Sequence, residues 1–453
     1  MNIGTPRPSA QVLDSPPVRP RLPRRRESRS VASALGNPLL RNGHLLTLSS
    51  ALVAVTGLCF WTTAAWKYDA SVVGSNSAAI SMLTLLVSIS QLNLSSAVVR
   101  FVPAAGRHTK ALIATVLIAA GCVALVVGVC AVSLVHFVSP GTTFFDATTA
   151  QAIFVVAVVA STIFIIQEGV LAGLRRTALV PLTNFVFALG KLGLVVAFSA
   201  TLPAHGILAA WALSATGIVL VINVFLFLRA IPHQQRITTA DAVGFPPLRQ
   251  LIRYVTLDYV GAICSVAAVT AMPMLVLAAL GATQNAYFSM AWLIGTSIFQ
   301  ISLNMGISLV VESSSNQSDL ARQARHVLVH TGKLLVAVVL MILVAAPYLL
   351  GVFGAAYREA ADTLRIFALS ALPHLVVMTG ISSARAQRRM KVVLWAQIPQ
   401  AAATIPLTWL LLPVIGMEGA SVAWLLTISL IACGLMVRKD SWLTIATPRE
   451  DRP

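Results

Sequence analysis

The chain has 453 residues, of which 57% are hydrophobic and only 10% charged, and its mean hydropathy is +0.84. A soluble domain carries about a quarter charged residues, so this composition excludes a disordered chain, a secreted disulfide scaffold and a conventional soluble enzyme. It predicts an integral membrane protein. The net charge of +17 does not indicate a nucleic-acid partner, because the basic residues lie in an N-terminal tail and in short segments between apolar runs.

Continuous apolar runs predict about twelve transmembrane helices and an all-α fold. A bilayer core about 30 Å thick needs roughly 20 apolar residues per helix, and the runs lack the alternation of a transmembrane β-barrel. No short apolar segment with a cleavage site precedes the first run, so we expect no signal peptide. In chain order the predicted helices cover residues 43–66, 77–98, 111–134, 151–172, 178–202, 206–228, 251–278, 284–310, 327–350, 362–383, 392–413 and 417–437.

Lys and Arg fall almost entirely on one side of this predicted topology. The opposite side holds only Lys67, Arg358 and Arg365, and Lys191 lies at membrane depth. Cytoplasmic loops carry such an excess of basic residues, so we expect a multi-pass protein of the cytoplasmic membrane with both termini in the cytoplasm. The Pro- and Arg-rich tail, residues 1–42, is predicted to be disordered and to be attracted to anionic membrane lipids.

The two halves of the chain resemble each other at a fixed offset. The pair Arg175–Arg176, between the fourth and fifth predicted helices, recurs 213 residues later as Arg388–Arg389, between the tenth and eleventh. The same offset relates residues in the last helix of each half: Gly206, Ala210, Trp211 and Leu213 correspond to Gly419, Ala423, Trp424 and Leu426.

This repeat predicts two six-helix lobes, residues 43–228 and 251–437, related by a parallel pseudo-two-fold axis along the membrane normal. Residues 229–250 form the predicted cytoplasmic linker, and 438–453 a cytoplasmic C-terminal tail. Two facing lobes can open a central cavity to either side in turn, which is alternating access. The chain has no phosphate-binding loop, no HExxH and no metal-ligand spacing of Cys or His, so we expect neither an enzyme nor a metal or cofactor.

Lys191 is the sharpest candidate for a functional site. A cation at the bilayer centre costs roughly 2.5–3.5 kcal/mol on insertion scales, so it should face a cavity or a partner. It could attract an anionic group such as a diphosphate, or instead form a buried ion pair or extend to the interface. Asp258 is the candidate counter-charge, with a local pair to Arg253 as the alternative.

Other polar residues within the predicted helices are weaker candidates for lining a cavity. Glu168 and Arg100 lie near helix ends, Arg365 has Asp362 beside it for a local pair, and His374 is expected to be structural. Most uncharged polar side chains in membrane helices bond across helix interfaces, so we expect only some of them to touch a substrate. The uncharged cavity candidates are Asn184, Gln91, Asn93, Gln300 and Asn304.

Three segments resemble those of the polysaccharide (O-antigen type) flippases of the multidrug/oligosaccharidyl-lipid/polysaccharide exporter superfamily. The first is Gln91–Pro103 (QLNLSSAVVRFVP) and the second is Leu171–Arg176 (LAGLRR), which Pro181, Asn184 and Lys191 follow. The third is Phe353–Tyr357 (FGAAY), followed by Leu364–Arg365 and Pro373. The resemblance covers roughly residues 40–440 and leaves out the tail.

The resemblance implies a flippase that moves a polyprenyl-diphosphate-linked glycan across the membrane by alternating access. The resemblance also implies that Lys191, Arg100 and Asp258 line the cavity. It implies glycan polymerases or glycosyltransferases as partners. One alternative is a cation-coupled multidrug antiporter of the same superfamily, which needs deep acidic residues where the first lobe offers Glu168. Another is a membrane glycosyltransferase or polymerase, which usually needs a sizeable outward loop or paired carboxylates, and the chain has neither.

Overall fold

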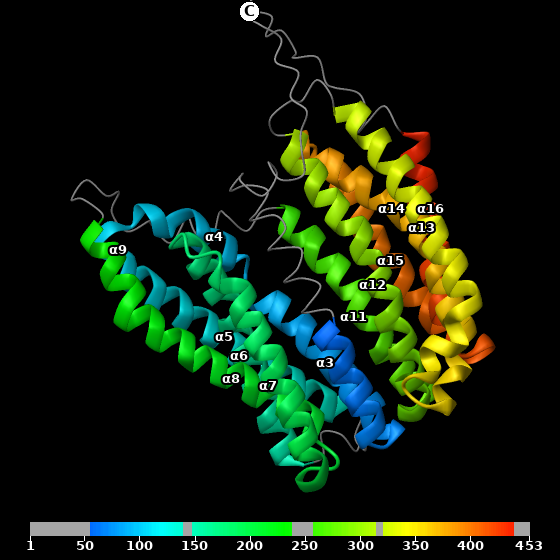
Figure 1. Ribbon diagram of the computed structural model, residues 1–453, viewed down its shortest axis with the longest axis horizontal. Coiled ribbons are helices and arrows are strands. Elements are labelled where there is room, and N and C mark those ends of the chain that lie inside the picture. The colour runs from blue at the N-terminus through cyan, green and yellow to red at the C-terminus, as the bar shows by residue number, and fades with distance from the viewer. Residues whose placement is uncertain (1–54, 139–146, 238–256, 314–319, 439–453) are drawn as a thin grey trace, which may run out of the picture. The chain divides into compact units, whose positions relative to one another are not determined.

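The computed structural model describes residues 55–138, 147–237, 257–313 and 320–438. By its contacts the chain divides into two units, residues 1–48 and 49–453, and all described residues belong to the second unit. Their regular structure is entirely helical (Figure 1). The predicted N-terminal tail and nearly all of the predicted C-terminal tail lie outside the described residues.

Eleven helices of the described residues are long and apolar enough to cross a membrane. The first predicted helix, 43–66, is described only in its last part, where residues 55–67 are helical. The spanning helices are α3 (Ala70–Ser90), α5 (Thr109–Val138), α6 (Thr148–Gly173), α7 (Leu179–Thr201), α8 (Gly206–Phe225), α11 (Leu257–Leu280), α12 (Ala282–Ser313), α13 (Leu320–Gly351), α14 (Ala361–Ala386), α15 (Met390–Ile415) and α16 (Glu418–Val437).

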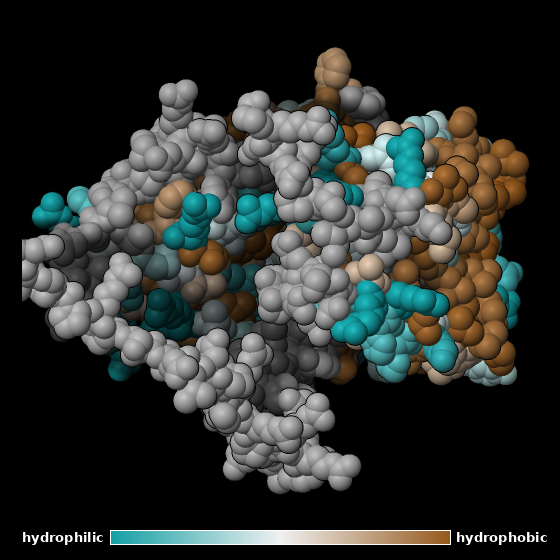
Figure 2. Space-filling view, turned by 90° about the horizontal axis from the view of Figure 1, so that it is seen from above, coloured by the Kyte–Doolittle hydropathy of each residue, from teal (hydrophilic) through white to brown (hydrophobic). Residues whose placement is uncertain are grey.

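The outer faces of these helices carry large apolar side chains. Examples are Leu220, Val344 and Leu430, which are 59%, 74% and 72% exposed. Such a surface is stable in lipid, where helices satisfy their own backbone hydrogen bonds. The prediction of an all-α membrane protein is therefore confirmed. Figure 2 looks onto one end of the helices and shows hydrophilic side chains there, with hydrophobic residues covering the flank at the right of the view.

The second predicted helix, 77–98, is not one helix. It begins earlier, at Ala70, and ends at Ser90, after which Leu92 and Asn93 adopt left-handed backbone conformations with φ of 47° and 55°. L-residues rarely take this conformation, and it cannot continue a right-handed helix. The short helix α4 (Leu94–Phe101) and two 3₁₀ turns follow, so Asn93 lies in a break between helices rather than within a span.

The sixth predicted helix extends beyond its expected end. After α8, a π-helical turn, Leu226–Ala230, leads directly into α9 (Ile231–Ile237). Pro232 is the second residue of α9 and has no N–H to donate, and the π-helical turn directly before it is a local adjustment of the kind that accommodates a proline within a continuous helix. The segment predicted as a linker, 229–250, therefore begins inside a helix; its remainder, from residue 238, lies outside the described residues.

The two loops that carry the paired arginines of the repeat have the same backbone conformation. We call the described residues up to 237 the first half and those from 257 onward the second half. Arg175 and Arg388 both lie in the left-handed region, with φ of 58° and 56°. In each loop the next residue, Arg176 or Arg389, donates its backbone N–H across the turn, at 2.8 Å, to the carbonyl five residues earlier. We call the helix ends that bear these loops the arginine-rich end and the other ends the opposite end.

Helix α3 belongs to the first half but packs extensively on α11 and α12 of the second (Figure 1). It also contacts α5, α6 and α8 of its own half. At the opposite end α3 lies so close to α12 that a Cβ on Gly74 would fall 1.8 Å from the carbonyl oxygen of Ala282. Near the arginine-rich end, the Tyr259 hydroxyl of α11 donates to the carbonyls of Ser88 and Ile89 at 2.5 and 3.1 Å.

Candidate functional site

Lys191 lies on α7 with its side chain turned into the protein and only 9% exposed. Its Nζ atom lies over three aromatic rings, 4.4 Å from the ring centroid of Trp211, 4.9 Å from that of Phe60 and 5.2 Å from that of Phe187. Cation–π contacts of desolvated groups are worth about 2 kcal/mol or more. This aromatic cage, defined by Phe60, Phe187 and Trp211, therefore offsets part of the cost of burying the ammonium group.

The cage joins three helices of the first half. Phe187 lies one turn before Lys191 on α7, Trp211 comes from α8, and Phe60 comes from the helix over residues 55–67. The Phe187 and Trp211 rings also pack edge to face with centroids 5.5 Å apart, and the Phe60 and Trp211 rings do so at 6.3 Å. Packing of the rings on each other holds the cage in one arrangement.

Among the described residues, no carboxylate pairs with Lys191 and no oxygen accepts a hydrogen bond from it. Aromatic rings stabilise the charge but leave the three N–H donors of an ammonium group without acceptors. A buried donor of this kind can bind an anionic oxygen that enters the first half. Lys191 is not extended to the interface, because its side chain is buried; its role in binding stays a prediction.

Asn184 lies on the same side of α7 as Lys191, since seven residues make two helical turns, a rise of about 10 Å. Its side-chain amide donates to the Glu168 carboxylate of α6 and also, at 3.0 Å, to the carbonyl of Val180. A cation and an amide thus lie on one side of α7, and the amide contacts an acid of α6. The structure places Glu168 near Asn184, so the one acid of the first lobe that the antiporter alternative invokes is hydrogen-bonded there.

The aromatic cage around Lys191 contains none of the five other predicted site residues whose side chains the structure describes and which lie outside α7: Gln91, Asn93, Arg100, Gln300 and Asn304. Gln91 and Asn93 are half-buried at the break after α3, and Arg100 is exposed in the last turn of α4 with its guanidinium 5.9 Å from the ring of Phe101. On α12, the Gln300 amide donates to the Asn304 side-chain oxygen at 3.1 Å, and both residues are exposed.

Asp258 is the second residue of α11, and its side chain lies outside those that the structure describes, as does Arg253. The proposed pairs of Asp258 with Lys191 or with Arg253 therefore stay predictions. A position at the start of α11 puts the Asp258 backbone near a helix end rather than at mid-span.

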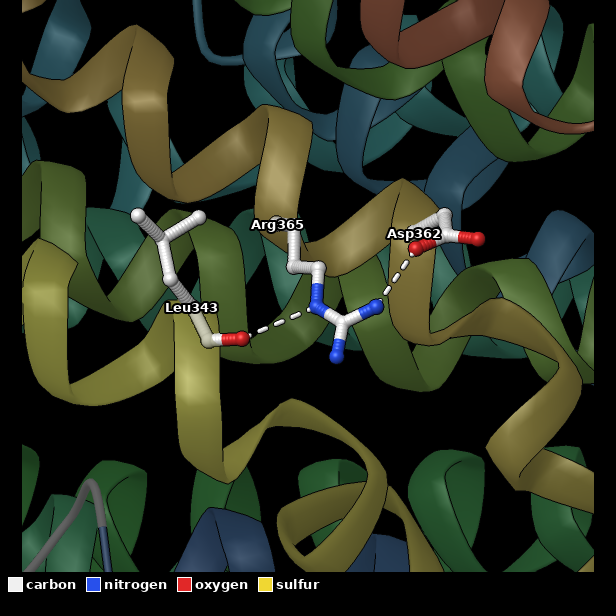
Figure 3. Close-up of polar contacts among 3 residues, drawn as sticks. All are labelled: Leu343, Asp362 and Arg365. Carbon is white, nitrogen blue, oxygen red and sulfur yellow. Dashed lines mark hydrogen bonds and ion pairs between the residues drawn. The ribbon is translucent and has the colours of Figure 1, made fainter.

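Arg365 forms the local pair expected from the sequence (Figure 3). Its Nη1 lies 2.7 Å from the Asp362 carboxylate, and its Nε donates at 2.9 Å to the carbonyl of Leu343. Arg365 thus connects α14 to α13. His374 is buried and stacks on Phe299 with ring centroids 4.8 Å apart, which suits the structural role expected of it.

Sequence reasoning missed a polar cluster between α3 and α12 at the opposite end. The Ser77 and Ser289 hydroxyls are 2.7 Å apart, and the Asn285 amide donates to the carbonyl of Gly74 at 2.7 Å and to Ser77 at 3.2 Å. Nearby, Trp66 donates to the carbonyl of Val352 at 2.8 Å. These contacts join the two halves. No local sequence pattern predicts them, because each contact needs one residue from the first half and one from the second.

Several solved structures that this chain resembles are described as transporters. One is described as the inward-facing conformation of a multidrug resistance MATE family transporter of the MOP superfamily; it is 14% identical over 86% of this chain and 94% of its own, with a TM-score of 0.66. The outward-facing conformation of such a transporter gives 16% identity over 89% and 96%, with a TM-score of 0.59. A MOP superfamily transporter from Pyrococcus furiosus, whose binding pocket is described as reversed in polarity, gives 13% identity over 88% and 95%, with a TM-score of 0.59.

No protein-family model matches the sequence, and no curated protein matches it either. The described part of the chain is a multi-pass membrane protein whose regular structure is helical. Its fold is that of the MATE family transporters of the MOP superfamily.

Proposed function

We propose that this protein is a flippase that carries a polyprenyl-diphosphate-linked oligosaccharide across the cytoplasmic membrane by alternating access. The observation that carries the proposal is Lys191, a buried cation with aromatic rings around it and no described carboxylate beside it. The diphosphate of a lipid-linked glycan supplies the oxygen acceptors that the ammonium group lacks. The lipid tail stays in the bilayer, and the saccharide occupies the space between the halves.

The polarity of the buried charge favours an anionic substrate over a cationic drug. Within this fold, the Pyrococcus furiosus transporter is described as having a reversed pocket polarity that suggests a different function. In the first half of this chain, the deep charge at mid-span is positive, and the acid Glu168 is already hydrogen-bonded to Asn184. A cation-coupled antiporter would use Glu168 instead, so the two functions depend on different residues.

The contacts between the halves suit alternating access. At the opposite end, Trp66, Ser77 and Asn285 join the first half to the second. The distribution of Lys and Arg predicts that both termini and the arginine-rich end lie in the cytoplasm. In that orientation these contacts close the outward side. The substrate then binds from the cytoplasmic leaflet, and transfer requires them to break.

The test is transfer of a fluorescent polyprenyl-diphosphate saccharide across proteoliposomes. Lys191→Met should lower the transfer rate about tenfold or more, because a hydrogen bond to a charged group contributes roughly 1.5–3 kcal/mol. Lys191→Arg keeps the charge and should retain part of the rate. Lys333→Met is the matched control, since it removes a lysine from an exposed face of α13 and should leave the rate unchanged.

If Lys191→Met transfers the glycolipid at the wild-type rate, Lys191 does not bind the diphosphate and the proposed contact is wrong. If the wild-type protein transfers no glycolipid but exports cationic dyes, and Glu168→Gln stops that export, the antiporter is the right function. Glycan polymerases and glycosyltransferases remain proposed partners, which cross-linking in cells that make the glycan would test.

A further inference from the structure

Basic side chains gather around two adjoining cavities at the arginine-rich end of the first half. The cavities measure about 440 and 580 Å³ and share the side chains of Arg176 and His233. Arg175 lines the first and Arg229 the second. Among the described residues, no carboxylate pairs with any of these three arginines. We call this site the basic pocket.

Local structure fixes the arginines of the basic pocket. Arg175 takes its left-handed conformation in the tight turn between α6 and α7, and the Arg176 guanidinium lies 5.7 Å from the ring centroid of Phe225 on α8. Arg229 lies in the π-helical turn Leu226–Ala230, which widens the helix at this level. Two segments, the turn between α6 and α7 and the π-helical turn, thus present three arginines to two adjoining cavities. Arginines grouped in this way bind the oxygens of a phosphate group.

An apolar row begins at the basic pocket and runs along the outer face of α8. Leu228 lines the second cavity and is 76% exposed. Val224, Val221 and Leu220, which are 59%, 64% and 59% exposed, follow at helical spacing on the same face. A cationic pocket above an exposed apolar row matches a molecule with a phosphate head and acyl chains.

The second half has a smaller pocket at the corresponding place. A cavity of about 250 Å³, between the start of α15 and the end of α16, is lined by Lys391, Trp395 and Arg438. The Arg438 guanidinium lies 5.1 Å from the ring centroid of Trp395, as Arg176 lies over Phe225 in the first half. Both halves therefore place a cation on an aromatic ring where their last two helices meet the membrane surface.

We propose that each of these pockets binds the phosphate of an anionic phospholipid of the surrounding bilayer. The arginines hold the phosphate oxygens, and the acyl chains of the lipid in the basic pocket lie along the row from Leu228 to Leu220. Inorganic phosphate offers the same oxygens, but it makes no use of the apolar row. The site is separate from Lys191, so the proposal stands or falls independently of the transported substrate.

Native mass spectrometry of the full-length protein in detergent, with added phosphatidylglycerol or phosphatidylcholine, tests the proposal. We expect two phosphatidylglycerol molecules to stay bound to the wild type and fewer phosphatidylcholine molecules. The variant Arg175→Gln/Arg176→Gln/Arg229→Gln should keep one, and adding Lys391→Gln/Arg438→Gln should leave none. The matched control, Arg107→Gln/Lys110→Gln/Arg325→Gln, removes three exposed cations at the same end outside the pockets and should keep two.

If the control variant loses as much lipid as the pocket variants, the lipid is held by the general positive charge of the surface, and the proposal is wrong. So would equal retention of phosphatidylcholine, or displacement of the lipid by 10-fold excess inorganic phosphate, which would indicate a free-phosphate site. Should the triple variant not fold, the single change Arg229→Gln at an exposed position is used. It should lower the retained phosphatidylglycerol, and unchanged retention would contradict the proposal.

Discussion

At the scale of single residues, Lys191 shows how a charge is held inside a membrane helix. The cage of Phe60, Phe187 and Trp211 stabilises the ammonium through ring faces and leaves its N–H donors available. A buried salt bridge would have used those donors, and removing its acid would leave an uncompensated charge. A cation held by rings can therefore engage and release an anionic ligand with less rearrangement than a paired one.

His205, in the turn between α7 and α8, makes the stability of the first half depend on pH. Burial lowers the pKa of His205 below its usual 6.5. The folded protein then prefers the neutral imidazole, and its contribution to stability is present above pH 6.5 and is lost as the pH falls through the lowered pKa. The melting temperature should therefore fall between pH 7.5 and pH 5 more steeply for the wild type than for His205→Gln. Identical slopes for the two proteins would exclude His205 as the cause.

The chemistry of the candidate site was only partly predictable from the sequence. Lys191 stands out because a cation within an apolar run is rare. Phe60 and Trp211 do not, since aromatic residues are ordinary in membrane helices and the three rings come from three helices. The local pair of Arg365 with Asp362 was predictable because three residues on a helix bring side chains together.

At the scale of elements, the close crossing of α3 over α12 depends on glycine. A Cβ at Gly74 would overlap the backbone of Ala282, which no side-chain movement can relieve. Gly74→Ala should therefore destabilise the protein by about 1–3 kcal/mol, the usual cost of overpacking. Thermal unfolding in detergent measures this as a lower melting temperature.

Gly217→Ala on α8 is the control for that experiment. No atom lies within 4 Å of a Cβ placed there, so the change should be neutral or stabilising by roughly 0.5–1 kcal/mol, because alanine loses less entropy in a helix. Equal melting temperatures for the two variants would mean that α3 and α12 do not approach each other this closely.

The positions of the helices were predictable from the sequence wherever a helix coincides with an uninterrupted apolar run. The helix α6, Thr148–Gly173, differs by at most three residues at either end from the predicted 151–172. The break at Leu92 and Asn93 was missed because neither residue is a glycine or proline, although Gln91, Asn93, Ser95 and Ser96 interrupt the apolar run there and asparagine takes a positive φ more readily than most residues. There the packing of α4 on α6 overrides the local pattern.

At the scale of the whole chain, the repeat relates the two halves but does not make them equal. Trp211 contacts Lys191, whereas its counterpart Trp424 packs against Trp292 and Phe299. Thr404, which corresponds to Lys191 at the offset of 213 residues, is buried and uncharged. Of these two corresponding positions, only the one in the first half carries a buried cation. The proposed diphosphate contact is therefore made by the first half and has no equivalent at Thr404.

The polar cluster between α3 and α12 offers a way to lock the halves together. In the double variant Ser77→Cys/Ser289→Cys the two thiols replace hydroxyls 2.7 Å apart, so an oxidant should join them in a disulfide. Transfer of the glycolipid should then stop and should resume after reduction. The two single variants are the controls. Unimpaired transfer by the cross-linked protein would show that these helices stay together throughout the cycle.

The position of α3 constrains how such a protein can move. A rod that touches both halves cannot follow each of them when they rotate apart, so one of its two sets of neighbours must be released. Its seam with α12 is tight and hydrogen-bonded through Asn285 and Ser77. If that seam is the one that opens, its opening and the release of α3 from the second half are a single event, and the packing of α3 on α11 and α12 adds to the cost of the broken hydrogen bonds.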